Sequence, residues 1–162
     1  MKSAFFRSRA AYGLILCGAL AGCATGSLVV SQPAKKSVVG SVQIQSAGDS
    51  ADPRLAQIFG SRLSDDLFHS KVHPFNPGSD LTVSYRFVQA NAGNRALRYL
   101  VGFGAGKGSV TVEVSFRLKD GTDAGTINVG GQISMGLVGG DFDTAVLKAA
   151  DEAATYISNN FG

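Results

Sequence analysis

Three segments of the chain alternate apolar and polar residues, and this pattern restricts the possible folds more than any other feature. They cover residues 81–87, 110–118 and 126–135, and a weaker alternation covers residues 38–44. A period of two places every second side chain on the same face of an extended strand. A sheet built from these strands therefore has one apolar and one polar face, which is typical of antiparallel sheets.

Two further segments have the apolar period of a helix. The first begins at Asp52-Pro53, where a residue that caps helices precedes one that is favoured in the first turn. The second begins near Asp141 and Asp143, whose negative charges suit a helix N-terminus. The predicted apolar stripes comprise Leu55, Ile58, Phe59, Leu63 and Leu67 in the first helix and Phe142, Ala145, Val146, Ala149, Ala153 and Ile157 in the second.

These elements predict the fold class. The apolar face of a one-sided sheet has to be covered, and we expect both helices to cover it. The prediction is an α+β fold, a two-layer sandwich with a four-stranded, mostly antiparallel sheet and two helices on one face, in the order β-α-β-β-β-α. The turn-forming residues 120–125 predict a hairpin between the last two strands, and we expect residues 81–87 to pair with residues 110–118 as well.

The N-terminus has the plan of a secretory signal peptide. Residues 1–9 contain three cations and no acid, and an apolar run over residues 10–20 follows. The run ends in small residues and a cysteine, an arrangement that resembles the lipobox of bacterial lipoproteins. The residues that match the lipobox are Leu20, Ala21 and Gly22, with Cys23 as the lipidation site.

The resemblance implies a cellular location for the protein. Lipoproteins of this kind are cut before the cysteine, which then carries a diacylglyceryl group and an amide-linked acyl chain, enough for durable anchoring. Ala24 follows Cys23, and the absence of Asp at this position favours the outer membrane, with the domain facing the periplasm. We therefore expect residues 1–22 to be a signal peptide, residues 23–36 a lipidated tether and residues 37–162 a single domain.

Charge and cysteine content exclude several classes of partner. Three of the 15 Lys and Arg residues lie in residues 1–22 and none of the 12 acidic residues does, so the chain beyond the leader has no net charge. A neutral domain has no long-range attraction to nucleic acid. Cys17 leaves with the leader and Cys23 carries lipid, so we expect neither a disulfide nor a cysteine metal site.

The segment between the second and third predicted strands, residues 91–108, is longer and more apolar than a hairpin loop. It does not match a phosphate-binding loop, because Gly108 follows Lys107 where Ser or Thr is needed. Two alternatives stay open, a segment packed over the edge of the sandwich and a segment that contacts a partner or the membrane. The candidate contact residues are Arg98, Tyr99, Leu100, Val101, Phe103 and Lys107.

This segment also carries a family resemblance. The Gly-Phe-Gly-Ala-Gly run at residues 102–106, followed by an alternating strand and the turn at 120–125, resembles an uncharacterised family of short bacterial lipoproteins of the domain-of-unknown-function 4410 kind. The family implies no activity and no catalytic residues. More loosely, the order of elements is similar to lipoprotein domains of curli secretion and exopolysaccharide export, some of which form rings.

A search for chemistry finds one weak candidate. His69 and His73 flank a loop, and Asp65 is four residues before His69 on the predicted helix, a spacing that metal ligands use. No third ligand is evident, so surface charge at a helix end explains these residues better. Elsewhere, no nucleophile elbow occurs, and Glu113 is expected to form a surface ion pair with Arg86.

The polar sheet face carries hydroxyls and amides but no aromatic residues for stacking bases, which also argues against nucleic acid. We therefore expect a non-enzymatic interaction or scaffold protein of an envelope assembly, with no catalytic residue, metal or cofactor. Its partners would be the membrane, through the lipid on Cys23, and an envelope protein or a second copy. The alternatives are a small-ligand or metal-binding or enzymatic domain using His69 to His73, and a ring-forming subunit of an export apparatus.

Overall fold

A computed structural model describes residues 25–48, 52–71, 74–88, 109–132 and 142–162. The cysteines, the lipobox residues and the segment 91–108 lie outside this part of the chain. The elements in chain order are β1 (Thr25–Gln32), β2 (Ser41–Ser46), α1 (Pro53–Phe68), β3 (Asn76–Pro77), β4 (Leu81–Phe87), β5 (Ser109–Leu118), β6 (Asp123–Gln132) and α3 (Phe142–Phe161).

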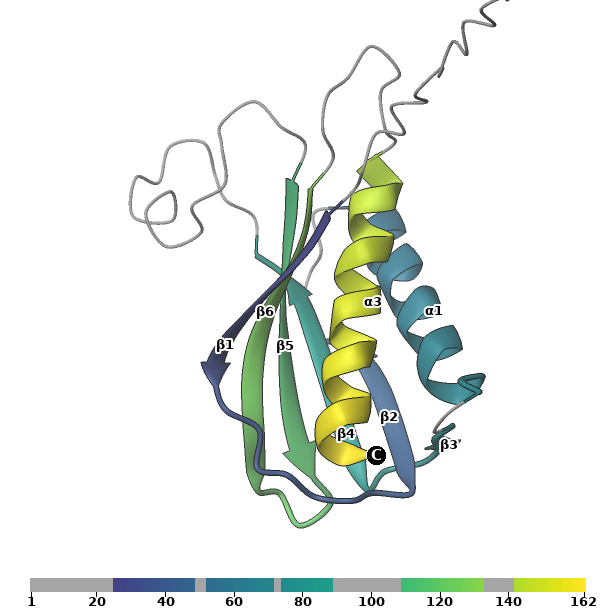
Figure 1. The fold of residues 1–162 in the computed structure, drawn as a ribbon, viewed down its shortest axis with the longest axis vertical. Coiled ribbons are helices and arrows are strands. Elements are labelled where there is room, and N and C mark those ends of the chain that lie inside the picture. Colours follow the sequence, from purple (N-terminus) through teal and green to yellow (C-terminus); the bar gives the residue numbers. More distant parts are fainter. Residues whose placement is uncertain (1–24, 49–51, 72–73, 89–108, 133–141) are drawn as a thin grey trace, which may run out of the picture.

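The strands form a single six-stranded sheet with the order β1-β6-β5-β4-β2-β3. Strands β1, β6, β5 and β4 pair antiparallel, whereas β2 is parallel to both β4 and β3. Both helices lie on the same face of the sheet, with α3 over β6, β1 and β5 and α1 beside it over β2 (Figure 1). The two-layer α+β arrangement is therefore as predicted.

The predicted four-stranded, mostly antiparallel sheet is wrong, because the sheet is mixed and has six strands. The first additional strand, β1, comes from residues that the sequence assigned to a tether, where Gly, Ser, Gln and Pro gave no sustained period. The second, β3, has two residues, too few for a period to show. The parallel pairing of β2 with β4 is possible because helix α1 lies between them in the chain, since parallel strands need a crossover connection.

Several local predictions are confirmed. The hairpin joins β5 to β6, with Gly121 and Gly125 at φ values of 85° and 127° that favour glycine. Strand β4 pairs with β5 as expected. The Asp52 side chain accepts a hydrogen bond from the backbone N–H of Arg54, and Pro53 occupies the first turn of α1.

The core lies between the sheet and the two helices. From α1 it takes Phe59, Leu63 and Leu67, all fully buried, while Leu55 and Ile58 are only partly buried. From α3 it takes mainly small residues, as the predicted stripe implied, while Phe142 is partly buried. The fully buried residues of α3 are Ala145, Val146, Ala149, Ala150, Ala153, Ile157 and Phe161. No helix in the described ranges is both long enough and apolar enough to span a bilayer.

The small side chains of α3 allow a close approach to β6. A Cβ atom built on Gly131 would overlap the backbone of Ala145, so only glycine fits at this position of the strand. Backbone cannot yield as a flexible side chain can, and the helix would have to move outward. Gly131 therefore sets the distance between α3 and the sheet.

We predict that Gly131→Ala destabilises the fold by about 1–3 kcal/mol, the usual cost of overpacking a well-packed interior. Gly40→Ala is the matched control, because its new Cβ would lie 3.8 Å from the Asp80 side chain, an ordinary contact. Urea unfolding of both variants measures the difference. Equal midpoints for the two variants would contradict the role given to Gly131.

Candidate functional site

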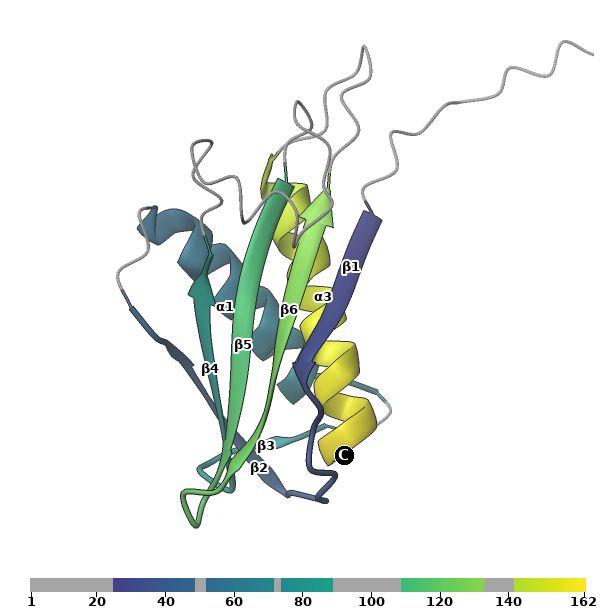
Figure 2. The ribbon, with the colours of Figure 1, turned by 90° about the vertical axis from the view of Figure 1, so that its left-hand side faces the viewer.

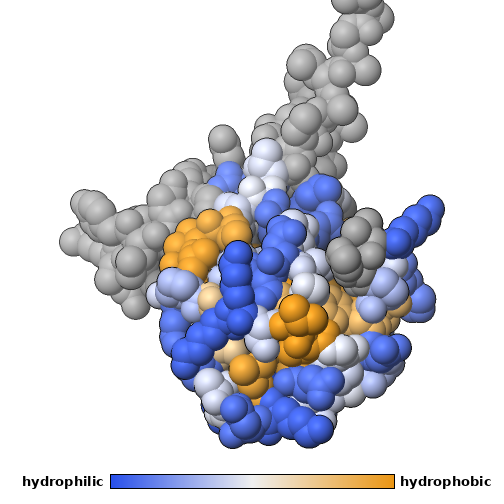
Figure 3. All heavy atoms as spheres, turned by 60° about the horizontal axis from the view of Figure 1, so that its bottom comes forward, coloured by the Kyte–Doolittle hydropathy of each residue, from blue (hydrophilic) through white to orange (hydrophobic). Residues whose placement is uncertain are grey.

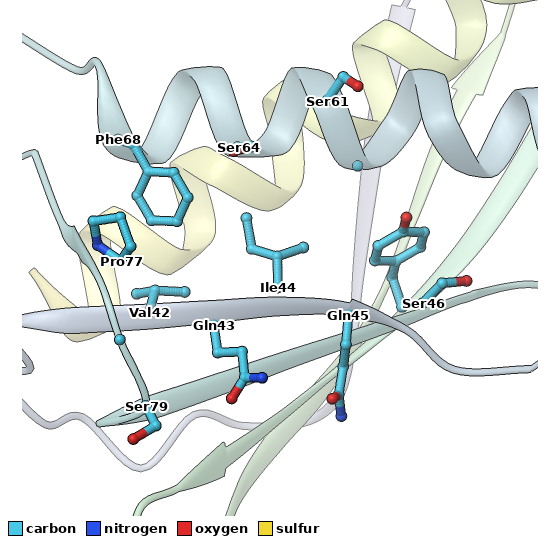
Figure 4. Close-up of a pocket in the computed structure, with 13 residues that line it drawn as sticks. Val42, Gln43, Ile44, Gln45, Ser46, Ser61, Ser64, Phe68, Pro77 and Ser79 are labelled. Carbon is cyan, nitrogen blue, oxygen red and sulfur yellow. The ribbon is translucent and has the colours of Figure 1, made fainter.

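A groove of about 690 Å³ runs between β2 and α1 at one edge of the sheet (Figure 4). Ile44 and Phe68 point into the space between the strand and the helix, whereas Gln43 and Gln45 point to the other side of β2. The groove is lined by Val42, Gln43, Ile44, Gln45, Ser46, Gly60, Ser61, Ser64, Phe68, Pro77, Gly78, Ser79 and Tyr85.

The outer edge of β2 is open along most of this groove. Strand β3 pairs with β2 only at Ser41 and Val42, and no described strand lies beside β2 after that point. The carbonyls of Gly40 and Val42 accept hydrogen bonds on the β3 side, from Asn76 and Gly78, with N···O distances of 3.1 Å each. On the opposite side, the N–H of Ala47 donates to the Tyr85 carbonyl of β4.

The hydrogen bonds of Gly40, Val42 and Ala47 show to which side each of the remaining backbone groups of β2 is directed. Successive residues of a strand direct their N–H and C=O groups to opposite sides. Ile44 and Ser46, which follow Val42 at intervals of two, therefore direct theirs away from β4 and toward the open edge. The groove thus combines unpaired strand hydrogen-bonding groups with an adjacent helix.

The inner wall of the groove is held by Tyr85. Its hydroxyl donates to the Ala56 carbonyl at 2.9 Å, and its ring lies 4.9 Å from the ring of Phe59. Gly60 makes room for it, since a Cβ there would lie 2.5 Å from the Tyr85 oxygen. Burial raises the pKa of Tyr85 and outweighs the opposing hydrogen bond with Ser46, so the phenol stays neutral and structural.

The chemistry of the groove suits binding. Its lining residues include no histidine, cysteine, lysine, arginine or carboxylate, so Ser61 and Ser64 have no general base beside them in the lining. What the groove offers is apolar surface, hydroxyls and backbone hydrogen-bonding groups. These are the groups that recognise an extended peptide.

A second cleft, of about 420 Å³, lies between the C-terminal halves of α1 and α3. Arg62 of α1 binds Asp151 of α3 with Nε···Oδ1 at 2.8 Å and Asp66 with Nη2···Oδ1 at 3.2 Å. Lys148 binds Asp151 as well, at 3.1 Å. Each acidic group is within ion-pair distance of a cation, so this cluster ties the two helices together and leaves no unpaired charge to act on a ligand.

The two carboxyl groups of this cluster have opposite pKa shifts. Burial works against ionisation of Asp151, but the hydrogen bonds from Arg62 and Lys148 outweigh it and hold the pKa of this carboxyl below its usual range. Burial raises the pKa of Asp66 and outweighs its attraction to Arg62. Asp151 is thus the carboxylate that stabilises the helix pair.

The residues singled out from the sequence do not assemble into a site. His69 ends α1 and pairs with Asp65, Nδ1 to Oδ1 at 3.1 Å, with both side chains mostly exposed. His73 lies outside the described residues. In the part of the chain that the structure describes, no group of three or more potential ligands could hold a metal ion.

Two other predictions have different outcomes. The ion pair between Arg86 and Glu113 is confirmed, with Nε···Oε1 at 2.7 Å on the exposed sheet face. The candidate contact residues from Arg98 to Lys107 and the lipidation site Cys23 lie outside the described residues and stay predictions.

The sequence analysis did not predict the groove between β2 and α1. The strand-helix-strand order of residues 38–87 was nevertheless a signal for a parallel pair of strands with a helix beside it.

Apolar side chains also reach the surface at several separate places (Figure 3). Three consecutive ones, Leu28, Val29 and Val30, lie on the edge strand β1, and the most exposed is Val38, at 86%, between β1 and β2. Leu147 of α3 is exposed as well. The β1 edge is therefore a second place where another strand could pair.

A profile of the family described as "Domain of unknown function (DUF4410)" matches residues 41–136, more than half of the chain. The chain belongs to this family. The match begins at β2 and includes the groove-lining part of α1, so the groove is built within the DUF4410 region. Among curated proteins, none matches the chain.

The solved structures that are distantly similar to this DUF4410 protein include the following three. A PelC dodecamer from Paraburkholderia phytofirmans is 12% identical, with a TM-score of 0.46, over 85% of this chain and 99% of that one. A point variant of the same dodecamer is 12% identical, with a TM-score of 0.40, over 78% and 94%. A PDZ domain protein from Parabacteroides distasonis is 7% identical, with a TM-score of 0.39, over 84% and 36%.

The opposite pKa shifts in the helix cluster predict opposite effects of two amide substitutions. The lowered pKa of Asp151 means that its carboxylate stabilises the fold above its unfolded-state pKa, and that this stability is lost as the pH falls through the folded-state pKa. Asp151→Asn should lower the free energy of unfolding at pH 7 by up to about 1 kcal/mol, as for partly exposed pairs. The loss should shrink as the pH falls below about 4, the unfolded-state pKa of an aspartate, and disappear once the pH is below the lower folded-state pKa as well.

Asp66→Asn is the matched control. The raised pKa of Asp66 means that its ionisation disfavours the fold as the pH rises, so a neutral amide should not lower stability at pH 7. Denaturant unfolding at pH 7 and pH 3 checks both variants. If Asp66→Asn destabilised the fold more than Asp151→Asn at pH 7, Asp66 and not Asp151 would be the carboxylate that stabilises the helix pair.

Proposed function

We propose that the chain is a lipid-anchored protein of the outer membrane whose domain binds an extended segment of an envelope protein and catalyses no reaction. The observation that carries the proposal is the open edge of β2 beside the α1 groove. An added strand would pair with the backbone groups of Ile44 and Ser46, which supplies affinity, while alternate side chains would enter the groove, which supplies specificity.

The domain already binds one such strand. The two residues of β3 pair in parallel with the beginning of β2, so the geometry of this edge accepts an extended segment. The contact between Ser41 and Asp80, Oγ to Oδ2 at 2.7 Å, ties the turn after β3 to β2. A partner strand would continue along the same edge beyond Val42, over the face of Ile44 and Phe68.

The anchor is supported by the N-terminal sequence. The basic, apolar and small-residue regions occur in the order of a signal peptide, and Leu20 to Gly22 precede Cys23 as in a lipobox. Fixing a protein to a membrane raises the effective concentration of any partner in the same envelope. A binding edge of modest affinity can therefore hold such a partner.

We predict that Ser46→Pro abolishes partner binding while the domain stays folded. Proline removes the N–H that faces the open edge, and edge strands tolerate proline where the N–H faces solvent. Ser46→Ala is the matched control, since it removes the hydroxyl that contacts Tyr85 but keeps the backbone N–H. The readout is photo-crosslinking in intact cells from a photoreactive residue placed at Ser64.

The expected result is a crosslinked adduct that Ser46→Ala keeps and Ser46→Pro loses, with similar melting temperatures for the two variants. Light scattering of the purified protein shows whether the segment comes from a second copy. An adduct that survives Ser46→Pro in a folded protein would rule out strand addition at this edge.

We also propose that the segment 91–108 contacts the membrane or a partner. Replacing both Leu100 and Phe103 with Ser should then reduce co-purification with envelope components and leave the melting temperature nearly unchanged. A large drop in melting temperature would instead assign these residues to packing within the domain. Arg117→Ser, on the exposed sheet face, is a control for surface substitution.

A further inference from the structure

Strand β1 begins at Thr25, two residues after Cys23. An extended chain spans at most about 3.6 Å per residue, so two residues reach no farther than ~7 Å. A lipidated Cys23 would therefore have almost no tether between the bilayer and the folded domain. This differs from the tether over residues 23–36 that the sequence predicted.

Strand β1 cannot serve as a tether, because it is bound along its length. It pairs with β6 from Thr25 to Gln32 and contacts α3. The residues after it are held as well. The N–H groups of Lys35, Ser37 and Val39 donate to backbone carbonyls of Ala124, Asn160 and Phe161 at 2.9–3.2 Å. Freeing this stretch would require breaking the edge of the sheet.

The strand register identifies the end of the sheet at which β1 begins. Thr25 lies opposite Gln132, the last residue of β6, and Gln132 lies opposite Ser109, the first residue of β5. The β5–β6 hairpin lies at the other end of the sheet (Figure 2). The C-terminus, near Phe161, also lies at that other end (Figure 1).

We infer that the end of the domain formed by Thr25, Ser109 and Gln132 rests directly on the lipid headgroups, with the β5–β6 hairpin pointing away from the bilayer. The inference depends on the lipid anchor of the proposed function. Ten residues of β5 span about 30 Å at 3.3 Å per residue, so the hairpin would stand roughly that far from the surface if the strands are upright.

This orientation leaves the β2 edge accessible. In the sheet, β6, β5 and β4 separate β1 from β2, so the anchored strand and the binding groove lie at opposite edges. The groove between β2 and α1 then faces sideways into the periplasm. A partner strand could reach Ile44 and Ser46 without displacing the domain from the membrane.

Site-specific labelling tests the orientation. The full chain is expressed in bacteria so that the leader, with Cys17, is removed and Cys23 is blocked by lipid, which leaves an introduced thiol as the reactive one. Ser109→Cys and Lys119→Cys place a fluorophore on exposed residues at the two ends of β5. Each labelled protein is inserted into vesicles of phosphatidylethanolamine and phosphatidylglycerol that contain a lipid with a nitroxide headgroup.

Fluorescence quenching by the nitroxide should be several-fold stronger for the label at position 109 than for the label at position 119. Insertion of a long Gly/Ser linker between Ala24 and Thr25 should reduce the difference, because a flexible linker lets the domain leave the surface. Equal quenching at the two positions, or stronger quenching at position 119, in lipidated protein would overturn the inferred orientation.

Mass spectrometry of the same preparation separates the two proposals. A polypeptide without lipid on Cys23 would overturn the anchor, and the orientation with it. A lipidated protein with the wrong quenching pattern would overturn the orientation alone. Unfolding midpoints of the labelled variants that match the parent chain ensure that the label reports on the native fold.

Discussion

The close packing of α3 on β6 determines the rest of the architecture. Gly131 and the alanines of α3 bring helix and sheet together, and α3 then covers β6, β1 and β5. Helix α1 runs in the same direction as α3, as two ion pairs show: Arg54 pairs with Asp143, and Arg62 pairs with Asp151, and the second pair lies eight residues farther along both helices. With α3 over the β1, β6 and β5 half of the sheet, α1 is left to cover the β2 side, and the groove forms between α1 and that strand.

The two edges of the sheet differ in what they offer. The β1 edge carries exposed Leu28, Val29 and Val30 and begins next to the proposed anchor. The β2 edge is shielded by β3 for two residues and is then open beside α1. Exposed edges are a liability that soluble proteins usually cover. The β2 edge is the one that we propose to bind a partner strand, whereas only the first residues of the β1 edge lie next to the proposed anchor.

Local sequence patterns predicted the elements that have a strong period of their own. Strands β4, β5 and β6 alternate because one face is buried, and α1 has a cap at Asp52 that acts within a few residues. Strand β1 was missed because none of its residues is buried, so burial imposes no period on its sequence. The groove was missed because the strand-helix-strand order of residues 38–87 allows a parallel pair but does not specify which strand lies next to β2 or where that edge stays open.

The sequence by itself determined the two-layer α+β class, the helix boundaries near Pro53 and Phe142, the β5–β6 hairpin and the pairing of β4 with β5. These features depend on contacts between neighbours in the chain or on burial of one face. Only the tertiary structure decided the parallel pairing of β2 with β4, the addition of β1 to β6 and the open edge beside α1. Those depend on pairing between distant segments, whose free energy comes from the packing of the whole sheet against α1 and α3.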